Sequence, residues 1–115
     1  MKITLIRHGR TIGNVKGCFN GVTNDPLCDD GVETIKEYVE KGIYPEVGIV
    51  VSSPLKRCLQ TSNLIYPQHK PIVVDNLREI NFGDFENKTH LQLENNPDYI
   101  RWIKSNGTSD IPNGE

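Results

Sequence analysis

The residues best suited to carry out chemistry are Arg7 and His8, which directly follow an apolar-rich run of strand length at residues 2–6. A guanidinium is a planar, permanently charged fork that matches a phosphate or a carboxylate. A neutral imidazole beside it can attack phosphorus and hold the phosphoryl group as a covalent intermediate. Gly9 follows, and its lack of a side chain lets backbone and substrate approach closely. The alternative is a strand edge with a solvated Arg-His pair, and these three residues alone leave both interpretations open.

A second pair of basic residues, Lys56 and Arg57, follows another apolar run at residues 48–52. Ligands of α/β proteins bind beyond the carboxyl ends of the strands, so we expect Arg57 to face the same crevice as Arg7. Two guanidiniums and the N–H groups of a helix start would together form an anion pocket. A solvated helix face is the alternative for Lys56 and Arg57.

An acidic segment after the third apolar run supplies candidates for a proton donor. A phosphate ester needs its leaving oxygen protonated, and a carboxylic acid in a desolvated site can do this. Glu79, flanked by Leu77 and Ile80, is the best placed, with Asp84 and Glu86 as competitors. The alternative is an acidic loop that only caps the sheet.

Alternating strands and helices must position these residues. Apolar runs of strand length at 2–6, 48–52 and 71–75 predict strands, and the last two are typical of strands covered on both faces. Val32, Ile35 and Val39 recur at helical spacing and predict a helix over about 29–42. Pro54 suits the first turn of a second helix, which is expected to run to about residue 66 and to end before Pro67. This order predicts right-handed crossovers and an α/β fold with a mostly parallel sheet and helices on both faces.

The remaining segments differ in character. Residues 11–30 predict a long functional loop. Residues 76–115 predict a capping segment with two short helices at 88–95 and 97–105. Residues 106–115 contain almost nothing to bury. A chain of 115 residues is one domain at most.

Composition excludes several classes of protein. The net charge of -2 and the pI near 5.9 argue against broad binding to nucleic acid or acidic membranes, so an anion site depends on a local gathering of arginines. No apolar run reaches the length needed to span a bilayer. The 3 cysteines form no CxxC pair, which is typical of reduced thiols in the cytoplasm, and neither they nor the 3 histidines show metal-ligand spacing. We therefore expect a cytoplasmic protein without a metal.

Three separated groups of motifs run through nearly the whole chain: Arg7-His8-Gly9-Arg10-Thr11 with Asn14, Gly21 and Pro26-Leu27; Ser52-Ser53-Pro54-Leu55-Lys56-Arg57-Cys58-Leu59-Gln60-Thr61; and Leu77-Arg78-Glu79 with Phe82-Gly83-Asp84-Phe85-Glu86. In this order and at these intervals they resemble the histidine phosphatase superfamily, the phosphoglycerate-mutase-like proteins. Within it, the third group, Tyr99 with Trp102, and residues 112–115 most resemble the alpha-ribazole phosphatase branch of cobalamin biosynthesis.

The resemblance implies hydrolysis of a phosphomonoester through a phosphohistidine, on a small phosphorylated metabolite such as alpha-ribazole 5'-phosphate and without a cofactor. Phosphoglycerate mutase activity is the less favoured reaction. The resemblance makes His8 the nucleophile and Glu79 the proton donor. The attacking nitrogen must be unprotonated, so the other ring nitrogen should donate to a backbone carbonyl. The residues expected to bind substrate are Arg7, Asn14, Asn20, Gly21 and Arg57.

The segments expected to select the alcohol part of the substrate are the loop around Phe19, Asn20 and Gly21 and the capping helices around Tyr99 and Trp102. Their side chains favour an alcohol with an apolar or ring-bearing part.

One feature of the superfamily has no match in this chain. The family carries a second histidine in a His-Gly motif, on a strand between the first and second strands predicted here, and no His-Gly pair besides His8-Gly9 occurs up to Glu115. The resemblance therefore implies the N-terminal portion of the fold (residues 1–115). His69 is expected at the amino end of the sheet and His90 on a surface helix, so neither should replace the missing histidine.

A sheet that lacks an interior strand leaves backbone groups unpaired. We therefore expect a homodimer or an exchange of strands between copies. The alternative function is a catalytically incomplete phosphate-binding or dimerising fragment, and a nucleic-acid module of another fold is a distant third.

Overall fold

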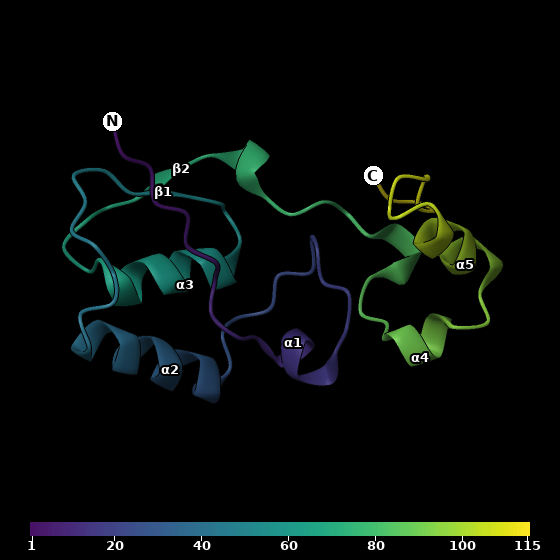
Figure 1. The fold of residues 1–115 in the computed structure, drawn as a ribbon, viewed down its shortest axis with the longest axis horizontal. Helices are drawn as coiled ribbons and strands as arrows, with labels where there is room; N and C mark the ends of the chain where they lie inside the picture. Colours follow the sequence, from purple (N-terminus) through teal and green to yellow (C-terminus); the bar gives the residue numbers. More distant parts are fainter.

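The computed structural model describes all 115 residues, which form two lobes joined by extended chain (Figure 1). The first lobe contains helix α2 (Asp29–Glu40), helix α3 (Lys56–Ile65) and a pair of strands, and the second contains helices α4 (His90–Leu93) and α5 (Pro97–Lys104). The molecule measures 47 × 30 × 20 Å. None of its helices combines the length and the apolar character needed to cross a bilayer.

The strand pair is parallel, as predicted. Strand β1 (Val51–Ser52) pairs with strand β2 (Ile72–Val73), and the N–H of Ile72 donates to the carbonyl of Val50 with an N···O distance of 2.9 Å. Helix α3 forms the crossover between them. Figure 1 shows α3 beside the pair and α2 beyond α3, so both helices lie on the same side of these strands.

Residues 2–6, the first predicted strand, are not a strand in this structure. Their N–H and C=O groups make no backbone hydrogen bonds, and Ile3 and Leu5 are 72% and 93% exposed. An extended segment becomes a strand only when a neighbour supplies the other half of the hydrogen-bond ladder. No segment of this chain does so. The prediction was wrong for this chain, whereas the unpaired backbone expected from a missing interior strand is present.

A short helix, α1 (Ile12–Lys16), lies in the region predicted to be a loop. The hydroxyl of Thr11 accepts a hydrogen bond from the N–H of Asn14, and the side-chain oxygen of Asn14 accepts one from the N–H of Thr11. This reciprocal pair is a capping box. The only buried residue of α1 is Gly13, so the helix has no apolar stripe that could have predicted it.

The remaining elements differ from the prediction mainly at their ends. Helix α3 begins at Lys56 with Leu55 as its N-cap, so Pro54 lies before the helix and not in its first turn. Helix α4 is shorter than predicted. Two 3₁₀ turns, η1 (Asp75–Leu77) and η2 (Gly83–Phe85), carry the chain from β2 into the second lobe.

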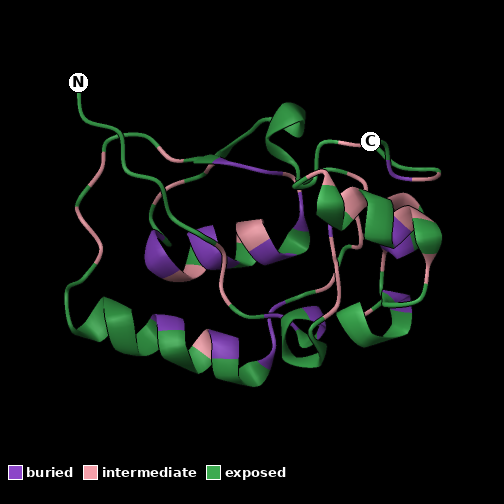
Figure 2. Cartoon of the chain, turned by 45° about the vertical axis from the view of Figure 1, so that its right-hand side comes forward, coloured by how far each residue is buried: buried purple, intermediate pink, exposed green.

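The core of the first lobe is small. Its buried members are Leu27, Ile35, Ile65 and Tyr66. Ile35 belongs to the predicted apolar stripe of α2, but Val39 on the same stripe is 41% exposed. Figure 2 shows that most of α2 is exposed, and its two buried residues are Gly31 and Ile35. The first lobe is therefore held by only a few apolar contacts.

The second lobe is built around aromatic side chains. Phe85, Leu93, Tyr99 and Ile111 form its buried core, and the ring of Phe85 meets that of Tyr99 edge-on at a centroid distance of 5.4 Å. Ile111 belongs to residues 106–115, which were predicted to have almost nothing to bury. That prediction was wrong at Ile111, because a single apolar residue in a polar stretch gives no periodic signal.

Two leucines of α4 provide a matched test of this core, because Leu93 is 1% exposed and Leu91 is 74% exposed. We expect Leu93→Ala to lower the free energy of unfolding by about 2–5 kcal/mol, since it leaves a cavity. Leu91→Ala should change it by less than about 0.5 kcal/mol. Urea denaturation followed by the fluorescence of Trp102, which packs against this core, measures both values. Equal effects would contradict the assignment of Leu93 to the core.

Candidate active site

His8 is half-buried at the end of the unpaired segment. Its Nδ1 lies 2.7 Å from the carbonyl oxygen of Gly9. A carbonyl can only accept, so Nδ1 carries the ring proton and Nε2 keeps its lone pair. The predicted hydrogen bond from His8 to a backbone carbonyl is confirmed.

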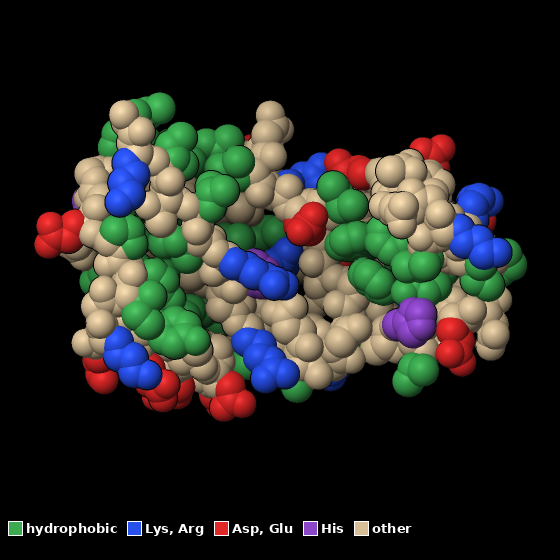
Figure 3. Space-filling model, in the orientation of Figure 1, with side chains coloured by type: hydrophobic (Ala, Val, Ile, Leu, Met, Phe, Trp, Pro, Cys, Tyr) green, Lys and Arg blue, Asp and Glu red, His purple; other side chains and the backbone are tan.

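Burial and the neighbouring charges together lower the pKa of His8. Burial lowers the pKa of His8, the hydrogen bond to Gly9 raises it, the cations of Arg57 and Arg7 lower it, and the carboxylate of Glu79 raises it. The net result is a pKa below the ordinary value of 6.5. The structure thus brings Arg7, Arg57 and Glu79 close enough to act on the imidazole. Figure 3 shows basic, acidic and histidine side chains meeting at a hollow near the middle of the molecule.

The two charged residues on the rim of this group, Arg7 and Glu79, are both exposed. One carboxylate oxygen of Glu79 accepts the N–H of Ile80 at 3.0 Å. The flanking residues Leu77 and Ile80 are 55% and 42% exposed. The apolar shelter expected around the proton donor is therefore not formed within this chain.

Glu86, a competitor for the role of proton donor, is instead a hydrogen-bond acceptor inside the fold. Burial raises the pKa of Glu86, but its hydrogen bonds outweigh burial and hold the pKa below the ordinary value of 4.5. A carboxylate held ionised in this way does not act as an acid at neutral pH. Its donors are the hydroxyl of Thr23 and the N–H groups of Phe82, Val22 and Gly21.

Asp84, the other competitor, is exposed and accepts a hydrogen bond from the side-chain amide of Asn113 at 2.9 Å. It does not appear among the groups that act on the pKa of His8. Of the three carboxylates considered, Glu79 is the one whose charge raises the pKa of His8.

Arg57 is only 3% exposed, and its guanidinium is largely engaged by the protein. It donates to the carbonyl oxygens of Thr23 (2.8 Å), Gly21 (2.8 Å) and Asn20 (3.3 Å). These three bonds leave at least two of its five N–H donors for an anion. Arg57 is thus a fixed cation in the wall of the site, in contrast to the exposed Arg7.

The first N–H groups of α3 were expected to contribute to the anion pocket. The N–H of Lys56 instead donates to the side-chain oxygen of Asn24 at 2.8 Å. The loop before α2 therefore occupies this donor, and the prediction was wrong for Lys56.

The two asparagines predicted to bind substrate both have structural partners. The side-chain oxygen of Asn14 accepts from the N–H and hydroxyl of Thr11 at 2.9 and 3.1 Å, which leaves its NH₂ group without a protein partner. The NH₂ group of Asn20 donates to Asp25 at 2.9 Å, and its side-chain oxygen is buried without a partner. Gly21 contributes only its backbone, as an acceptor for Arg57.

Thr61 is a site residue that the sequence analysis missed. Its hydroxyl accepts from the N–H of Gly9 at 3.0 Å and donates to the carbonyl of Arg57 at 2.7 Å, so it ties the nucleophile's segment to α3. A side chain on Gly9 would bring a Cβ within 2.6 Å of Ile35 and 3.2 Å of Leu27. Gly9 therefore lets the backbone pack closely against the core of the first lobe. The only sequence signal for Thr61 was its place in the second motif.

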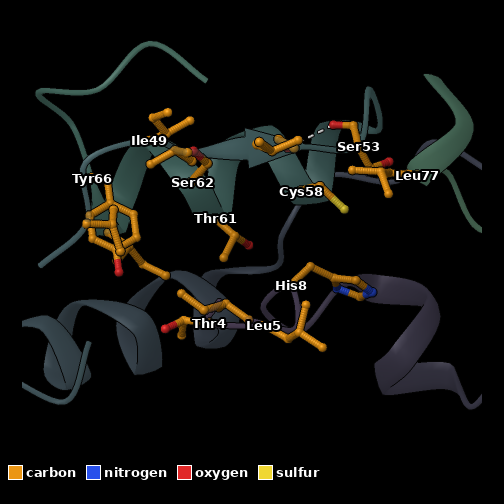
Figure 4. A pocket seen from close by; sticks show the side chains of 16 residues that line it. Thr4, Leu5, His8, Ile49, Ser53, Cys58, Thr61, Ser62, Tyr66 and Leu77 are labelled. Atoms are coloured by element: carbon orange, nitrogen blue, oxygen red, sulfur yellow. Dashed lines mark hydrogen bonds between the residues drawn. The ribbon is translucent and has the colours of Figure 1, made fainter. Parts of the chain in front are cut away.

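A largely apolar cavity of about 390 Å³ extends from His8 along the unpaired segment. In Figure 4, Thr4, Leu5 and His8 lie along one side and face Thr61 of α3, while Tyr66 lies at the end away from His8. The cavity separates the first predicted strand from β1. The resemblance places the family's additional strand between these same two segments.

The other two histidines have partners of their own. Nδ1 of His90 is hydrogen-bonded to the hydroxyl of Tyr99 at 2.7 Å. The ring of His69 meets Tyr66 edge-on at a centroid distance of 6.1 Å. Neither histidine contributes to the group around His8, in agreement with the prediction.

Comparisons with known proteins identify the family. Residues 3–115 match the histidine phosphatase superfamily (branch 1). The whole chain is 30% identical to the adenosylcobalamin/alpha-ribazole phosphatase of Salmonella typhimurium, covering 59% of that protein. It is 29% identical to the protein named "Probable phosphoglycerate mutase GpmB" of Proteus mirabilis, covering 55% of it.

A solved structure supports the same relationship. The alpha-ribazole phosphatase from Shigella flexneri superposes with a TM-score of 0.82 at 30% identity, over 96% of this chain and 56% of that one. The chain spans less than two thirds of the length of these relatives. The motifs, the fold and the family match agree: this chain belongs to branch 1 of the histidine phosphatase superfamily.

Proposed function

We propose that this chain supplies the nucleophile and much of the phosphate site of a phosphomonoesterase that works through a phosphohistidine. The observation that carries the proposal is the tautomer of His8, whose proton is held on Nδ1 by Gly9, in a ring whose pKa the cations of Arg57 and Arg7 help to lower. A neutral nitrogen nucleophile flanked by cations suits attack on a phosphate, because the cations offset the charge on its oxygens.

The reaction divides into two displacements at phosphorus. In the first, Nε2 of His8 forms a bond to phosphorus, the P–O bond to the alcohol breaks, and Glu79 gives its proton to the leaving oxygen. In the second, water attacks the phosphohistidine, Glu79 takes a proton from that water, the P–N bond breaks and inorganic phosphate leaves. Arg7 and Arg57 hold the equatorial oxygens in both steps, which is the main contribution a protein makes to phosphoryl transfer. The free NH₂ group of Asn14 is a further donor for them.

The proposed substrate is a small phosphorylated metabolite of the alpha-ribazole 5'-phosphate class. The name of the Salmonella relative and the aromatic residues beside loop 20–23 support this class. The ring centroid of Phe19 lies 5.6 Å from that of Phe82 and 5.8 Å from that of Trp102. All three side chains are half-buried, so part of each ring is accessible to the ring of a bound alcohol. Tyr99 is only 2% exposed and packs inside the lobe. The 3 free thiols support a reducing compartment, the cytoplasm.

A second candidate function is a phosphate-binding or dimerising module with an incomplete site. The unpaired backbone of residues 2–6 favours it, because this segment is available to pair with another chain. The absence of a second site histidine among these 115 residues also favours it.

Hydrolysis of p-nitrophenyl phosphate distinguishes the two functions. The enzyme proposal expects release of p-nitrophenol by the wild-type chain and none above background by His8→Gln, because the amide cannot form the phosphoryl intermediate. His90→Gln serves as the matched control and should retain activity. Equal background release from the wild type and His8→Gln would leave only the phosphate-binding module.

The charges around His8 lead to a second prediction, in which two substitutions shift the pKa of His8 in opposite directions. The pKa of His8, followed by the ring-proton shifts in NMR titrations, should lie below 6.5 in the wild type. Arg7→Met removes a cation and should raise this pKa, whereas Glu79→Gln removes an anion and should lower it. Shifts in the same direction would show that these side chains do not flank the imidazole. With the lowered pKa, the neutral nucleophile persists to pH values below 6.5.

Light scattering tests the proposed association between copies. We expect a mass above the 13.0 kDa of one chain, because the exposed apolar residues Ile3 and Leu5 and the free backbone beside them favour pairing. Leu5→Lys should shift the mass toward one chain, since a charge on an edge opposes strand pairing. A well-folded wild-type monomer would contradict this proposal.

A further inference from the structure

Two consecutive peptide groups lie between the guanidinium of Arg57 and the carboxylate of Glu86. In the first, the carbonyl of Asn20 accepts from Arg57 at 3.3 Å and the N–H of Gly21 donates to Glu86 at 2.9 Å. In the second, the carbonyl of Gly21 accepts from Arg57 at 2.8 Å and the N–H of Val22 donates to Glu86 at 2.9 Å. The C=O and N–H of a trans peptide point in opposite directions. The loop is therefore held from both sides by opposite charges.

The contacts around this loop leave little freedom for it to move. Thr23 adds a third hydrogen bond on each side of the loop. Its hydroxyl donates to Glu86, and its carbonyl accepts from Arg57 at 2.8 Å. A Cβ on Gly21 would lie 1.7 Å from the carbonyl oxygen of Ile80 and 2.9 Å from Glu86. No side chain other than hydrogen fits there, so the loop and the two segments around it are in direct contact.

The burial of Arg57 explains why such an arrangement is needed. A guanidinium that is 3% exposed requires partners for its charge, yet no carboxylate forms a salt bridge with it. Its partners are carbonyl dipoles, and Glu86 strengthens those dipoles because it accepts from the opposite ends of the same peptide groups. Arg57 and Glu86 thus form an indirect ion pair through the backbone.

We propose that Glu86 is a positioning residue that acts through loop 20–23 to hold the guanidinium of Arg57 toward a phosphate bound beside His8. The proposal rests on the proposed phosphatase function for the identity of the anion. It assigns Glu86 a role distinct from proton transfer. A glutamine at this position cannot replace the carboxylate, because its NH₂ group donates where Gly21, Val22 and Thr23 also donate.

The affinity for inorganic phosphate, measured by isothermal titration calorimetry, tests the role of Glu86. We expect Glu86→Gln to weaken phosphate binding at least about tenfold, as the loss of a charged hydrogen-bond network does. Asp84→Asn is the matched control from the same segment and should change binding less than about twofold, since Asp84 contacts only Asn113 among side chains. An unchanged affinity in Glu86→Gln would overturn the proposal.

A double-mutant cycle separates positioning from general stability. If Glu86 acts through Arg57, adding Glu86→Gln to Arg57→Lys should weaken phosphate binding little further. Additive losses would mean that Glu86 supports the fold and not the orientation of Arg57. Thr23→Val, which removes one donor to Glu86 and leaves both peptide groups, should give a smaller loss. It provides the test if Glu86→Gln does not fold by circular dichroism.

Protection of the guanidinium protons of Arg57 from solvent exchange gives a readout that needs no anion. NMR should show slow exchange in the wild type and in Asp84→Asn, and at least about tenfold faster exchange in Glu86→Gln. Failure of the wild type to bind phosphate, with this pattern intact, would count against the proposed function and support the positioning role. Phosphate binding with equal exchange in all three proteins would refute the positioning role alone.

Discussion

A buried guanidinium must be surrounded by acceptors, and the arrangement of this chain around Arg57 follows from that requirement. The loop at residues 20–23 turns three carbonyl groups toward Arg57. The N–H groups of the same loop then point away from Arg57, and Glu86 of the second lobe accepts two of them. Arg57 in the first lobe is therefore linked through this loop to Glu86 of the second lobe. The candidate site includes Arg57, so it lies where loop 20–23 joins the first lobe to the second.

The nucleophile depends on the same cation in a different way. Arg57 contributes to the low pKa of His8, and its own carbonyl accepts from Thr61, whose hydroxyl holds the N–H of Gly9. A single residue of α3 thus supplies charge to the imidazole and, through Thr61, a fixed point for the backbone that carries it. Gly9 makes this approach sterically acceptable, since any larger residue would meet Ile35.

Local patterns in the sequence predicted the elements whose formation depends mainly on nearby residues. The apolar runs at 48–52 and 71–75 with a helix between them indicated the parallel pair, and the chemistry of phosphoryl transfer indicated the tautomer of His8. The runs themselves did not reveal that residues 2–6 lack a neighbour, because pairing depends on a distant segment. The hydrogen bond from the N–H of Lys56 to Asn24 and those from loop 20–23 to Glu86 are also contacts between distant residues. Neither spacing nor composition gives a signal for such contacts.

The attachment of His8 is asymmetric. On its carboxyl side, Gly9 is bonded to Thr61 and the carbonyl of Arg10 accepts the N–H of Cys28 at 3.0 Å. On its amino side, no backbone bond restrains the chain. The backbone that carries the imidazole is therefore restrained by hydrogen bonds from one side only, and a strand seated in the cavity beside residues 4–6 would restrain it from the other. Pairing of residues 2–6 with a neighbouring strand would then also fix the position of the nucleophile that follows them.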